Sequence, residues 1–256
     1  MLQEFEWNTL NNILIELYTI KNINSLSFKI MKILKMLIPY SKGYFIILDD
    51  NKNIIKENSY FIGFSENVID KYINTYYEKD YIKYLYDFSF ETNAYKDTNI
   101  LENNIRKNTD FYINFLKPEN IIYGCGIMII RDNKIIGILN FFRNENLGDF
   151  TEKEIYILNI LKKHIENMLY NIIKINQILI NTDKSIDEFS NKFGLTSREK
   201  DILKLIKNGY SNEKISNELS ISLSTVKKHI YNLYNKTFVS SRSQLISLFM
   251  NEIELK

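Results

Sequence analysis

The C-terminal stretch from Leu195 to Lys236 constrains the fold of this 256-residue chain more than any other segment. It reads as three short helices separated by tight turns. Thr196 begins a Thr-x-x-Glu capping box, and Ser211 and Ser222 are suited to cap the second and third helices. Gly209 can end the first helix in the left-handed conformation. Helix starts and stops at this close spacing predict a compact all-helical domain.

Apolar residues recur at helical spacing in this stretch and predict one buried side for each helix. A fourth helix is predicted to begin at Ser241, which forms a capping box with Gln244. The predicted core residues of the four helices are Ile202, Leu203, Ile206, Ile215, Leu219, Val226, Ile230, Leu233, Leu245 and Leu248.

The third helix carries the most informative polar surface. When its apolar side faces inward, hydroxyl and basic side chains remain on the other side. Such groups hold DNA phosphates, and Lys can also donate to guanine in the major groove. A helix face that is only exposed to solvent would show the same spacing, so the spacing alone leaves two interpretations, DNA binding and a solvated surface. The side chains concerned are Ser224, Thr225, Lys227, Lys228, Tyr231 and Asn235.

The charge distribution along the chain gives weak support to the DNA-binding interpretation. From Thr196 onward there are ten Lys and Arg against six Asp and Glu, a net charge of +4. The whole chain has a net charge of +2, which leaves −2 for the part before Thr196. A basic domain after a slightly acidic one is typical of proteins that bind nucleic acid.

The C-terminal stretch resembles the LuxR-type (FixJ/NarL-type) helix-turn-helix. The resemblance is carried by LTSRE at its start, by GYSNEKI over 209–215, and by Ser222-x-x-Thr225-Val226-Lys227-x-His229. It implies a four-helix domain in which Lys227, Lys228 and Tyr231 read bases, while Ser224, Thr225 and His229 hold the DNA backbone. Two residues depart from the family pattern: Ser216 stands where Ala is usual, and Phe238 stands where Leu is usual. We expect both departures to affect packing.

The first 180 residues predict an α+β domain. Two helical patterns occupy the first forty residues and end at Pro39. Residues 43–48 and 54–61 read as one hairpin, and residues 121–130 and 134–142 as a second, apolar enough to form the centre of a sheet. The segment between the hairpins is polar, aromatic and mostly helical in pattern.

This part of the chain resembles, more weakly, the GAF-like sensor domains that precede LuxR-type helix-turn-helix domains. Gly137-Ile138-Leu139 on a late strand, Gly148-Asp149-Phe150-Thr151 before a long helix, and His164 within that helix carry the resemblance. It implies a PAS/GAF-like antiparallel sheet flanked by helices, often with a small-molecule site.

Aromatic side chains in the central segment are the candidate ligand contacts. Tyrosine offers a large apolar face with a hydroxyl at its tip, although most of these rings are expected to serve packing. Tyr72, Tyr76 and Asp80 are spaced as in the acyl-homoserine-lactone-binding relatives, but Tyr81 stands where those carry Pro. The ligand-site candidates are Phe64, Tyr72, Tyr76 and Tyr81.

Catalytic chemistry finds little support in the sequence. The two histidines, His164 and His229, lie in different predicted domains, and Cys125 is the single cysteine, so no nucleophile–base pair or metal cluster is predicted. Asp49 and Asp50 fit a polar turn rather than the acidic phosphoacceptor site of a receiver domain. We therefore expect neither an enzyme nor a cofactor.

A long helix is predicted from Thr151, which forms a capping box with Glu154. Its apolar residues alternate by three and four, a spacing that permits a coiled coil between two protomers. The alternative is that the helix packs on its own sheet, and we expect the first half to do so and the second half to dimerise. The seam residues are Leu158, Leu161, Ile165, Met168, Ile172, Ile175 and Leu179.

Together these patterns predict a sensor and dimerisation domain over 1–180, a linker over 181–194 and a DNA-binding domain over 195–256. The chain start shows no secretion signal, and no apolar run reaches the roughly 18 residues of a membrane helix, so a cytoplasmic bacterial protein is expected.

The predicted function is sequence-specific transcription regulation by a homodimer under a small-molecule or partner signal. RNA polymerase would be a further partner of an activator. In the alternative, the N-terminal domain binds no small molecule and only mediates protein interaction and dimerisation.

Overall fold

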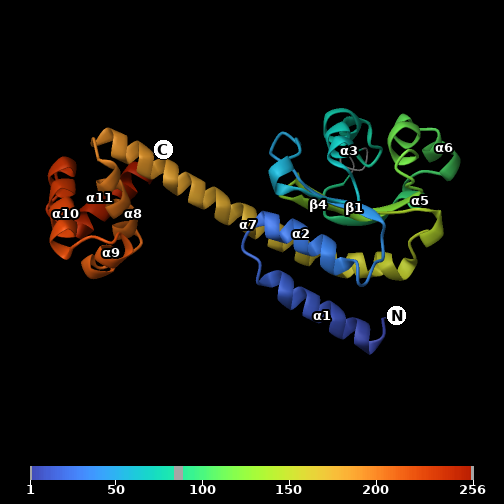
Figure 1. The fold of residues 1–256 in the computed structure, drawn as a ribbon, viewed down its shortest axis with the longest axis horizontal. Helices are drawn as coiled ribbons and strands as arrows, with labels where there is room; N and C mark the ends of the chain where they lie inside the picture. Colours follow the sequence, from blue (N-terminus) through green and yellow to red (C-terminus); the bar gives the residue numbers. More distant parts are fainter. Residues whose placement is uncertain (1, 84–88, 255–256) are drawn as a thin grey trace. The chain divides into compact units, whose positions relative to one another are not determined.

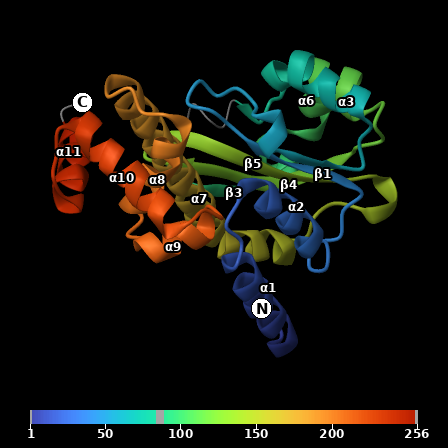
Figure 2. The same ribbon diagram turned by 60° about the vertical axis from the view of Figure 1, so that its left-hand side comes forward.

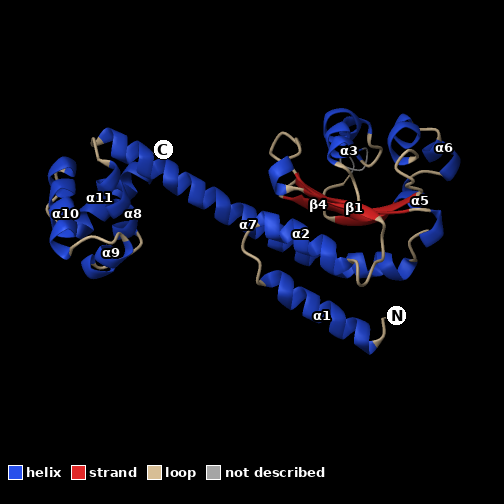
Figure 3. Ribbon diagram, viewed as in Figure 1, coloured by secondary structure: helices blue, strands red, loops and turns tan. Residues whose placement is uncertain are grey.

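The computed structural model describes residues 2–83 and 89–254, and for residues 178–182, 253 and 254 it describes the backbone alone. The chain divides into two compact units, Met1–Lys174 and Ile175–Lys256. The first unit contains a five-stranded antiparallel sheet with helices on both faces, and the second is helical (Figure 1, Figure 3). The predicted α+β domain followed by an all-helical domain is confirmed.

The sheet has the strand order β2-β1-β5-β4-β3. Its centre is the predicted second hairpin, formed by β4 (Tyr123–Arg131) and β5 (Lys134–Arg143). β1 (Lys42–Ile47) pairs with the other side of β5, so that Leu139 lies opposite both Phe45 and Ile127. Every strand-to-strand pairing is antiparallel.

Two features of the sheet differ from the prediction. The partner of β1 is shorter than expected, since β2 covers only Tyr60–Ile62 and a 3₁₀ turn occupies Lys56–Asn58. The edge strand β3 (Asn93–Lys96) was not predicted at all. Four residues that include Asn and Lys give no periodic signal, and this strand forms because its backbone pairs with β4.

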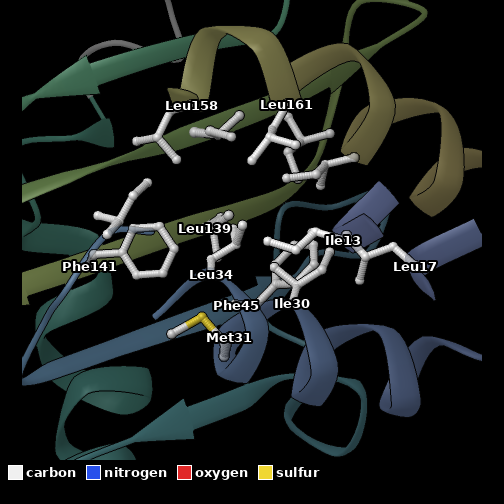
Figure 4. Close-up of a cluster of buried hydrophobic side chains, with 14 of the residues drawn as sticks. Ile13, Leu17, Ile30, Met31, Leu34, Phe45, Leu139, Phe141, Leu158 and Leu161 are labelled. Carbon is white, nitrogen blue, oxygen red and sulfur yellow. The ribbon is translucent and has the colours of Figure 1, made fainter. Parts of the chain in front are cut away.

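One face of the sheet packs against α1 (Glu4–Tyr18), α2 (Ile23–Leu34) and the first half of α7 (Glu152–Lys192). Figure 4 shows side chains from the three helices meeting Phe45, Leu139 and Phe141 of the sheet. The predicted capping box at the start of α7 is present, with the Thr151 N–H donating to the Glu154 carboxylate at 2.8 Å. This layer is the larger hydrophobic core of the first unit.

The α7 seam requires a correction. Leu158, Leu161 and Ile165 are fully buried in the core of their own unit, and Met168 and Ile172 are 5% exposed. These five residues therefore cannot form a coiled coil with a second chain, whereas the expectation that the first half of the helix covers the sheet is confirmed. Of the other two seam residues, Ile175 is exposed, and the Leu179 side chain lies outside the described residues.

The opposite face of the sheet is covered by short helical segments. These are α3 (Glu66–Lys71), a π-helical turn (Tyr72–Tyr76), a 3₁₀ turn (Tyr77–Lys79), α5 (Asp97–Ile100), α6 (Asn103–Lys107) and a second π-helical turn (Tyr112–Leu116). Figure 2 shows α3 and α6 on the side of the sheet opposite α1 and α2. Gly126 permits close packing here, since a Cβ at this position would lie 2.1 Å from the Leu139 carbonyl oxygen.

The second unit contains α8 (Ser197–Lys207), α9 (Asn212–Glu218), α10 (Leu223–Thr237) and α11 (Arg242–Glu254). Its core also holds Ile186 and Phe189 from the end of α7. The predicted linker over 181–194 is therefore helical through Lys192, and its second half packs inside the helical unit. Ile186, Phe189 and Phe193 follow helical spacing and supply this packing, but the many polar residues of the segment concealed the pattern.

Candidate functional site

The four C-terminal helices begin and end close to the predicted residues. Thr196, Ser211 and Ser222 are the N-caps of α8, α9 and α10, and each side chain accepts a hydrogen bond from a backbone N–H three residues later. At α11 the Ser241 hydroxyl accepts from the Gln244 N–H, but the Gln244 amide oxygen accepts from Ser240 instead of Ser241. All ten predicted core residues except Leu219 and Leu248 are buried, and these two pack partly buried against the same core.

The helix α10 is fixed by its buried side. Val226 and Leu233 are fully buried, and Ile230 is 8% exposed, in a core shared with α8 and α9. The remaining side is open: Lys227, Lys228 and Ser224 are exposed, and Tyr231 is 65% exposed. His229 and Thr225 are half-buried. A rigid helix therefore presents the predicted basic and hydroxyl-bearing face to solvent.

Three hydroxyl groups cluster at the N-terminus of α10. The Ser222 Oγ lies 2.8 Å from Ser224 Oγ and 2.7 Å from Thr225 Oγ1, and it accepts from the Thr225 N–H at 3.1 Å. The N-terminus of a helix carries a partial positive charge and unpaired N–H groups, which favour an anion such as phosphate. The hydroxyl cluster adds donors at the same place.

Two arginines and a serine hold the helix-turn-helix together through backbone carbonyls. Arg198 Nη2 donates to the Leu219 carbonyl at 2.8 Å, which ties α8 to the end of α9. Arg242 of α11 donates to the Tyr210 carbonyl before α9. The Ser216 hydroxyl donates to the Ile221 carbonyl in the turn between α9 and α10 at 2.5 Å. The departure from Ala at position 216 thus adds a hydrogen bond across the turn that spacing alone did not reveal.

Phe238 does not pack as expected. Its side chain is 90% exposed, and its backbone has a φ of 55° at the end of α10. This left-handed conformation is usual for Gly or Asn at a helix end and unfavourable for a side chain with a bulky Cβ substituent. The position is a helix terminus and contributes nothing to the core.

The predicted ligand-site residues lie together on the sheet face opposite α1 and α2. Tyr72 and Tyr81 are 2% exposed, and Phe64 and Tyr76 are partly buried in the same cluster. Phe64, Tyr72 and Tyr76 each have ring centroids within 6.2 Å of that of Phe115. Tyr81 meets Phe111, which stacks on Phe115 at 5.3 Å. We call the surface formed by these rings and by the polar residues Tyr44, Asp80 and Asn140 the aromatic face. Tyr84 and Tyr86, from the same tyrosine-rich segment, lie outside the described residues.

A buried polar chain crosses the aromatic face. Asn140 Nδ2 donates to the Tyr44 hydroxyl at 3.2 Å, Tyr44 lies 3.0 Å from the Tyr72 hydroxyl, and Tyr72 donates to Asp80 at 2.9 Å. Burial raises the pKa of Asp80 to about 7, against the opposing effect of hydrogen bonds from the Ile82 N–H and Tyr72. The Asn140 Oδ1 has no hydrogen-bond partner among the residues that the structure describes.

A second buried polar group lies beside the first. Tyr81 donates to Asp97 Oδ2 at 2.6 Å, and the same oxygen lies 4.0 Å from Arg106 Nη1. Burial raises the pKa of Asp97, although Tyr81 and Arg106 act in the opposite direction. Within the described part of the chain, Asp97 Oδ1 and the Nε and Nη1 of Arg106 lack hydrogen-bond partners. Asp97 and Arg106 were not predicted, because isolated charged residues in a polar segment give no sequence signal for burial.

Other residues named from the sequence have structural roles. Asp49 closes its own turn by accepting from the N–H groups of Asn51 and Asn53 at 2.9 and 2.8 Å, as the turn interpretation predicts. Cys125 is buried in the core. The His164 Nδ1 lies 2.9 Å from the Tyr18 hydroxyl of α1. Over residues 2–83 and 89–254, no group of His, Cys, Asp and Glu has the arrangement of a metal site.

No helix within residues 2–83 and 89–254 combines the length and the apolar character needed to cross a bilayer.

Residues 194–249 match the family model described as "Bacterial regulatory proteins, luxR family" (GerE). The monoamine regulon transcriptional regulator of Klebsiella aerogenes is 27% identical over 142 residues, which are 55% of this chain and 56% of that protein. The HTH-type transcriptional regulator MalT of Yersinia pestis (strain Pestoides F) is 42% identical over 65 residues, 25% of this chain and 7% of that protein. The chain thus spans about half of the first relative and a small part of the second.

A solved structure also resembles the first unit. The LBD domain of VqsR from Pseudomonas aeruginosa aligns with 67% of this chain and 98% of its own length, at a TM-score of 0.50 and 13% identity. At this identity the similarity concerns the fold alone. The N-terminal α/β unit therefore has the fold of that domain, and the C-terminal unit is a LuxR-type helix-turn-helix domain.

Proposed function

We propose that this protein is a sequence-specific DNA-binding transcription regulator in which α10 is the recognition helix. The observation that supports this most directly is the solvent-exposed face of α10. Lys227, Lys228 and Tyr231 lie on this face, and three buried residues hold the helix in place. In a helix-turn-helix, the N-terminal half of the second helix enters the major groove and reads base edges. Lys227 and Lys228 are placed to donate to guanine, while the hydroxyl cluster at Ser222 to Thr225 holds a phosphate.

Selection of bound duplexes from a random-sequence pool tests this proposal. The wild-type chain is expected to enrich one motif, and Lys227→Ala is expected to weaken binding and relax the preference at one base position. Lys184→Ala is the matched control, because it removes the same charge from an exposed position on α7 outside the helix-turn-helix. Enrichment of no motif by the wild type would contradict sequence-specific binding.

We also propose that the first unit senses a small molecule at the aromatic face. Support comes from buried polar atoms of Asn140, Asp97 and Arg106 that lack hydrogen-bond partners among the residues that the structure describes, because buried polar groups are nearly always hydrogen-bonded. Asp80, with a pKa near 7, can donate or accept a hydrogen bond at neutral pH. A ligand that carries both donor and acceptor groups fits this set, with its apolar part against the rings of Phe111 and Phe115.

Native mass spectrometry of the chain purified from bacterial cells tests the sensor. The expected result is a molecule that the wild type retains, that Asp80→Asn loses, and that the control Asp50→Asn, at an exposed position of the turn, still retains. The alternative, a domain that serves only protein interaction and dimerisation, is favoured by exposed aromatic residues on α1 and α7. Identical mass spectra with no bound molecule, and no thermal shift with a metabolite panel, would favour that alternative.

A further inference from the structure

The exposed side chains of α10 lie along one side of the helix, and the residue that ends the helix continues this side. Over residues 223–237 the exposed side chains are those of Ser224, Lys227, Lys228, Tyr231 and Asn235. Each lies three or four residues from another, so at about 100° per residue they share an arc of about 100°. Phe238 follows Asn235 by three residues, which places its Cα on the same arc. We call these six residues the α10 line.

Phe238 is held in an unusual state. Its side chain is 90% exposed, and its φ of 55° is unfavourable for a residue with a bulky side chain. The Phe238 N–H donates to the Asn235 carbonyl at 3.4 Å and the Val239 N–H to the Tyr234 carbonyl at 3.1 Å, so the backbone is fixed at this point. Backbone strain of this kind is concentrated at functional sites.

The surroundings of Phe238 suit a nucleic acid better than a protein. From Ser222 to Asn251 the sequence has four Lys and Arg and no Asp or Glu. The Ser241 and Ser243 hydroxyls lie 3.2 Å apart at the start of α11. A protein partner requires a contiguous apolar surface, whereas Thr237 is buried and Val239 packs partly buried against the core. An exposed ring on a basic, hydroxyl-bearing surface matches a polyanion that also has apolar sugar groups.

Distances along α10 determine which part of a duplex Phe238 can reach. With a rise of 1.5 Å per residue, Phe238 lies about 10 Å beyond Tyr231 and about 15 Å beyond Lys228. The major groove is about 12 Å wide. When the N-terminal half of α10 contacts bases in the groove, Phe238 therefore lies at the edge of the groove, beside the sugar-phosphate backbone.

We propose that Phe238 is a further DNA-contact residue, whose ring packs against deoxyribose at the edge of the major groove that α10 enters. The proposal rests on the proposed function, since it requires α10 to be the recognition helix. The contact adds affinity by burying apolar surface of the ring. Because the sugar is the same at every base pair, the contact carries no sequence information.

Substitutions of Phe238 separate DNA contact from folding. In fluorescence anisotropy with a selected duplex and the full-length chain, Phe238→Ala should weaken binding about fivefold to tenfold, as burial of part of one ring predicts. Phe238→Gly should weaken binding equally while raising the midpoint of thermal unfolding, a combination that a purely structural role cannot produce. Wild-type affinity in both variants would overturn the proposal. Should the Gly variant fail to fold, the Ala variant decides the question.

Met250→Ala is the matched control. Met250 is 44% exposed on α11, so this substitution removes an exposed apolar side chain of the same unit that is not part of the α10 line. It should leave the affinity for the selected duplex at the wild-type value. A loss equal to that of Phe238→Ala would show that any exposed apolar residue of the unit has this effect, and would overturn the assignment of Phe238.

The dependence on salt and on base sequence identifies the kind of contact. An uncharged ring releases no counterions, so Phe238→Ala should bind more weakly than the wild type at every salt concentration, with the same slope. The loss should be the same factor for the selected duplex and for a duplex with one changed base pair. A flatter slope, or a loss confined to one base pair, would overturn the sugar contact.

A fluorine label reports the contact directly. With para-fluorophenylalanine in place of Phe238, the fluorine resonance should shift as the selected duplex is added, because the ring leaves water. The same label in place of Phe249, which is 1% exposed, should respond little. An unchanged resonance at position 238 in the saturated complex would overturn the proposal.

The lysines of α10 separate failure of this proposal from failure of the proposed function. If Lys227→Ala combined with Lys228→Ala weakens binding and Phe238→Ala does not, the contact proposed for Phe238 is wrong and the recognition helix stands. If the wild type binds no duplex, the proposed function is contradicted and the Phe238 contact with it.

Discussion

The Lys236 ammonium donates to the Glu199 carboxylate at 2.7 Å, joining the end of α10 to the start of α8. Glu199 is 2% exposed and also accepts from the Thr196 N–H at 2.8 Å in the capping box. Burial opposes ionisation of Glu199, but hydrogen bonds from Lys236 and Thr196 outweigh it and lower its pKa. The recognition helix is therefore fixed at its far end by a charge pair as well as by its apolar side.

Removal of Lys236 should destabilise the helical unit. Lys236→Met leaves a buried carboxylate without its cation, and because the Lys236 side chain is 34% exposed we expect a loss of only about 2 kcal/mol. Urea unfolding of the isolated 175–256 segment, monitored by circular dichroism, measures it. Lys228→Met on the exposed side of the same helix should change stability by less than about 0.5 kcal/mol. Equal effects of the two substitutions would show that the pair is not structural.

The end of α7 should be required for the stability of the helix-turn-helix domain. Phe189 is 3% exposed and meets Phe249 of α11 edge-on, with ring centroids 5.3 Å apart. Phe189→Ala is expected to destabilise the unit by about 3 kcal/mol through loss of buried area and creation of a cavity. Phe238→Ala removes the same group from a 90% exposed position and should have little effect. A 194–256 fragment as stable as 175–256 would contradict this account.

Phe238→Gly should stabilise the same unit. The φ of 55° at this position disfavours any residue with a Cβ, and Gly adopts it without strain. The greater freedom of Gly in the unfolded chain reduces the gain, so we expect about 1 kcal/mol. Thermal unfolding of Phe238→Gly against Phe238→Ala isolates the backbone effect from loss of the ring. A lower midpoint for the Gly variant would contradict the conformation assigned to this helix end.

Asp80 should make the first unit less stable as the pH rises. Its pKa is about 7 in the folded chain, above the value near 4 of an unfolded aspartate, so the folded state binds the proton more tightly. Its contribution to stability is therefore complete below about pH 4 and is lost as the pH rises to about 7. Asp80→Asn removes this titration. Relative to that variant, the wild type should lose a few kcal/mol of unfolding free energy between pH 5 and pH 8, on the order of 1.4 kcal/mol per pKa unit. Parallel pH profiles for the two proteins would exclude the shift.

Much of the helical unit was predictable because each of its features has a local signal. The hydroxyl caps at Thr196, Ser211 and Ser222 are read directly from residue type and spacing, and the apolar period identifies the inward side of α10. Phe238 shows the limit of this reasoning, since a positive φ at a phenylalanine contradicts its backbone preference.

The features that were missed depend on contacts between distant parts of the chain. The α7 seam has a spacing that fits both an own-sheet contact and a coiled coil, and only the surrounding sheet decides between them for Leu158 and Leu161. The Asp97–Arg106 pair is buried against β4, where a Cβ at Gly124 would lie 2.3 Å from Asp97 Oδ2, and this contact between separate elements leaves no local signal in the sequence. The strand β3 likewise exists through pairing with β4 and not through its own composition.

The most direct test of the central claim is the salt dependence of DNA binding by full-length protein. Fluorescence anisotropy with a selected duplex should show affinity falling about tenfold or more between about 50 and about 200 mM salt, because bound Lys side chains release counterions. Lys227→Ala combined with Lys228→Ala should weaken binding and flatten this dependence, while Lys184→Ala should retain the wild-type slope. Salt-independent binding by the wild type, with unchanged affinity in the double variant, would contradict the assignment of α10 as the DNA-reading helix.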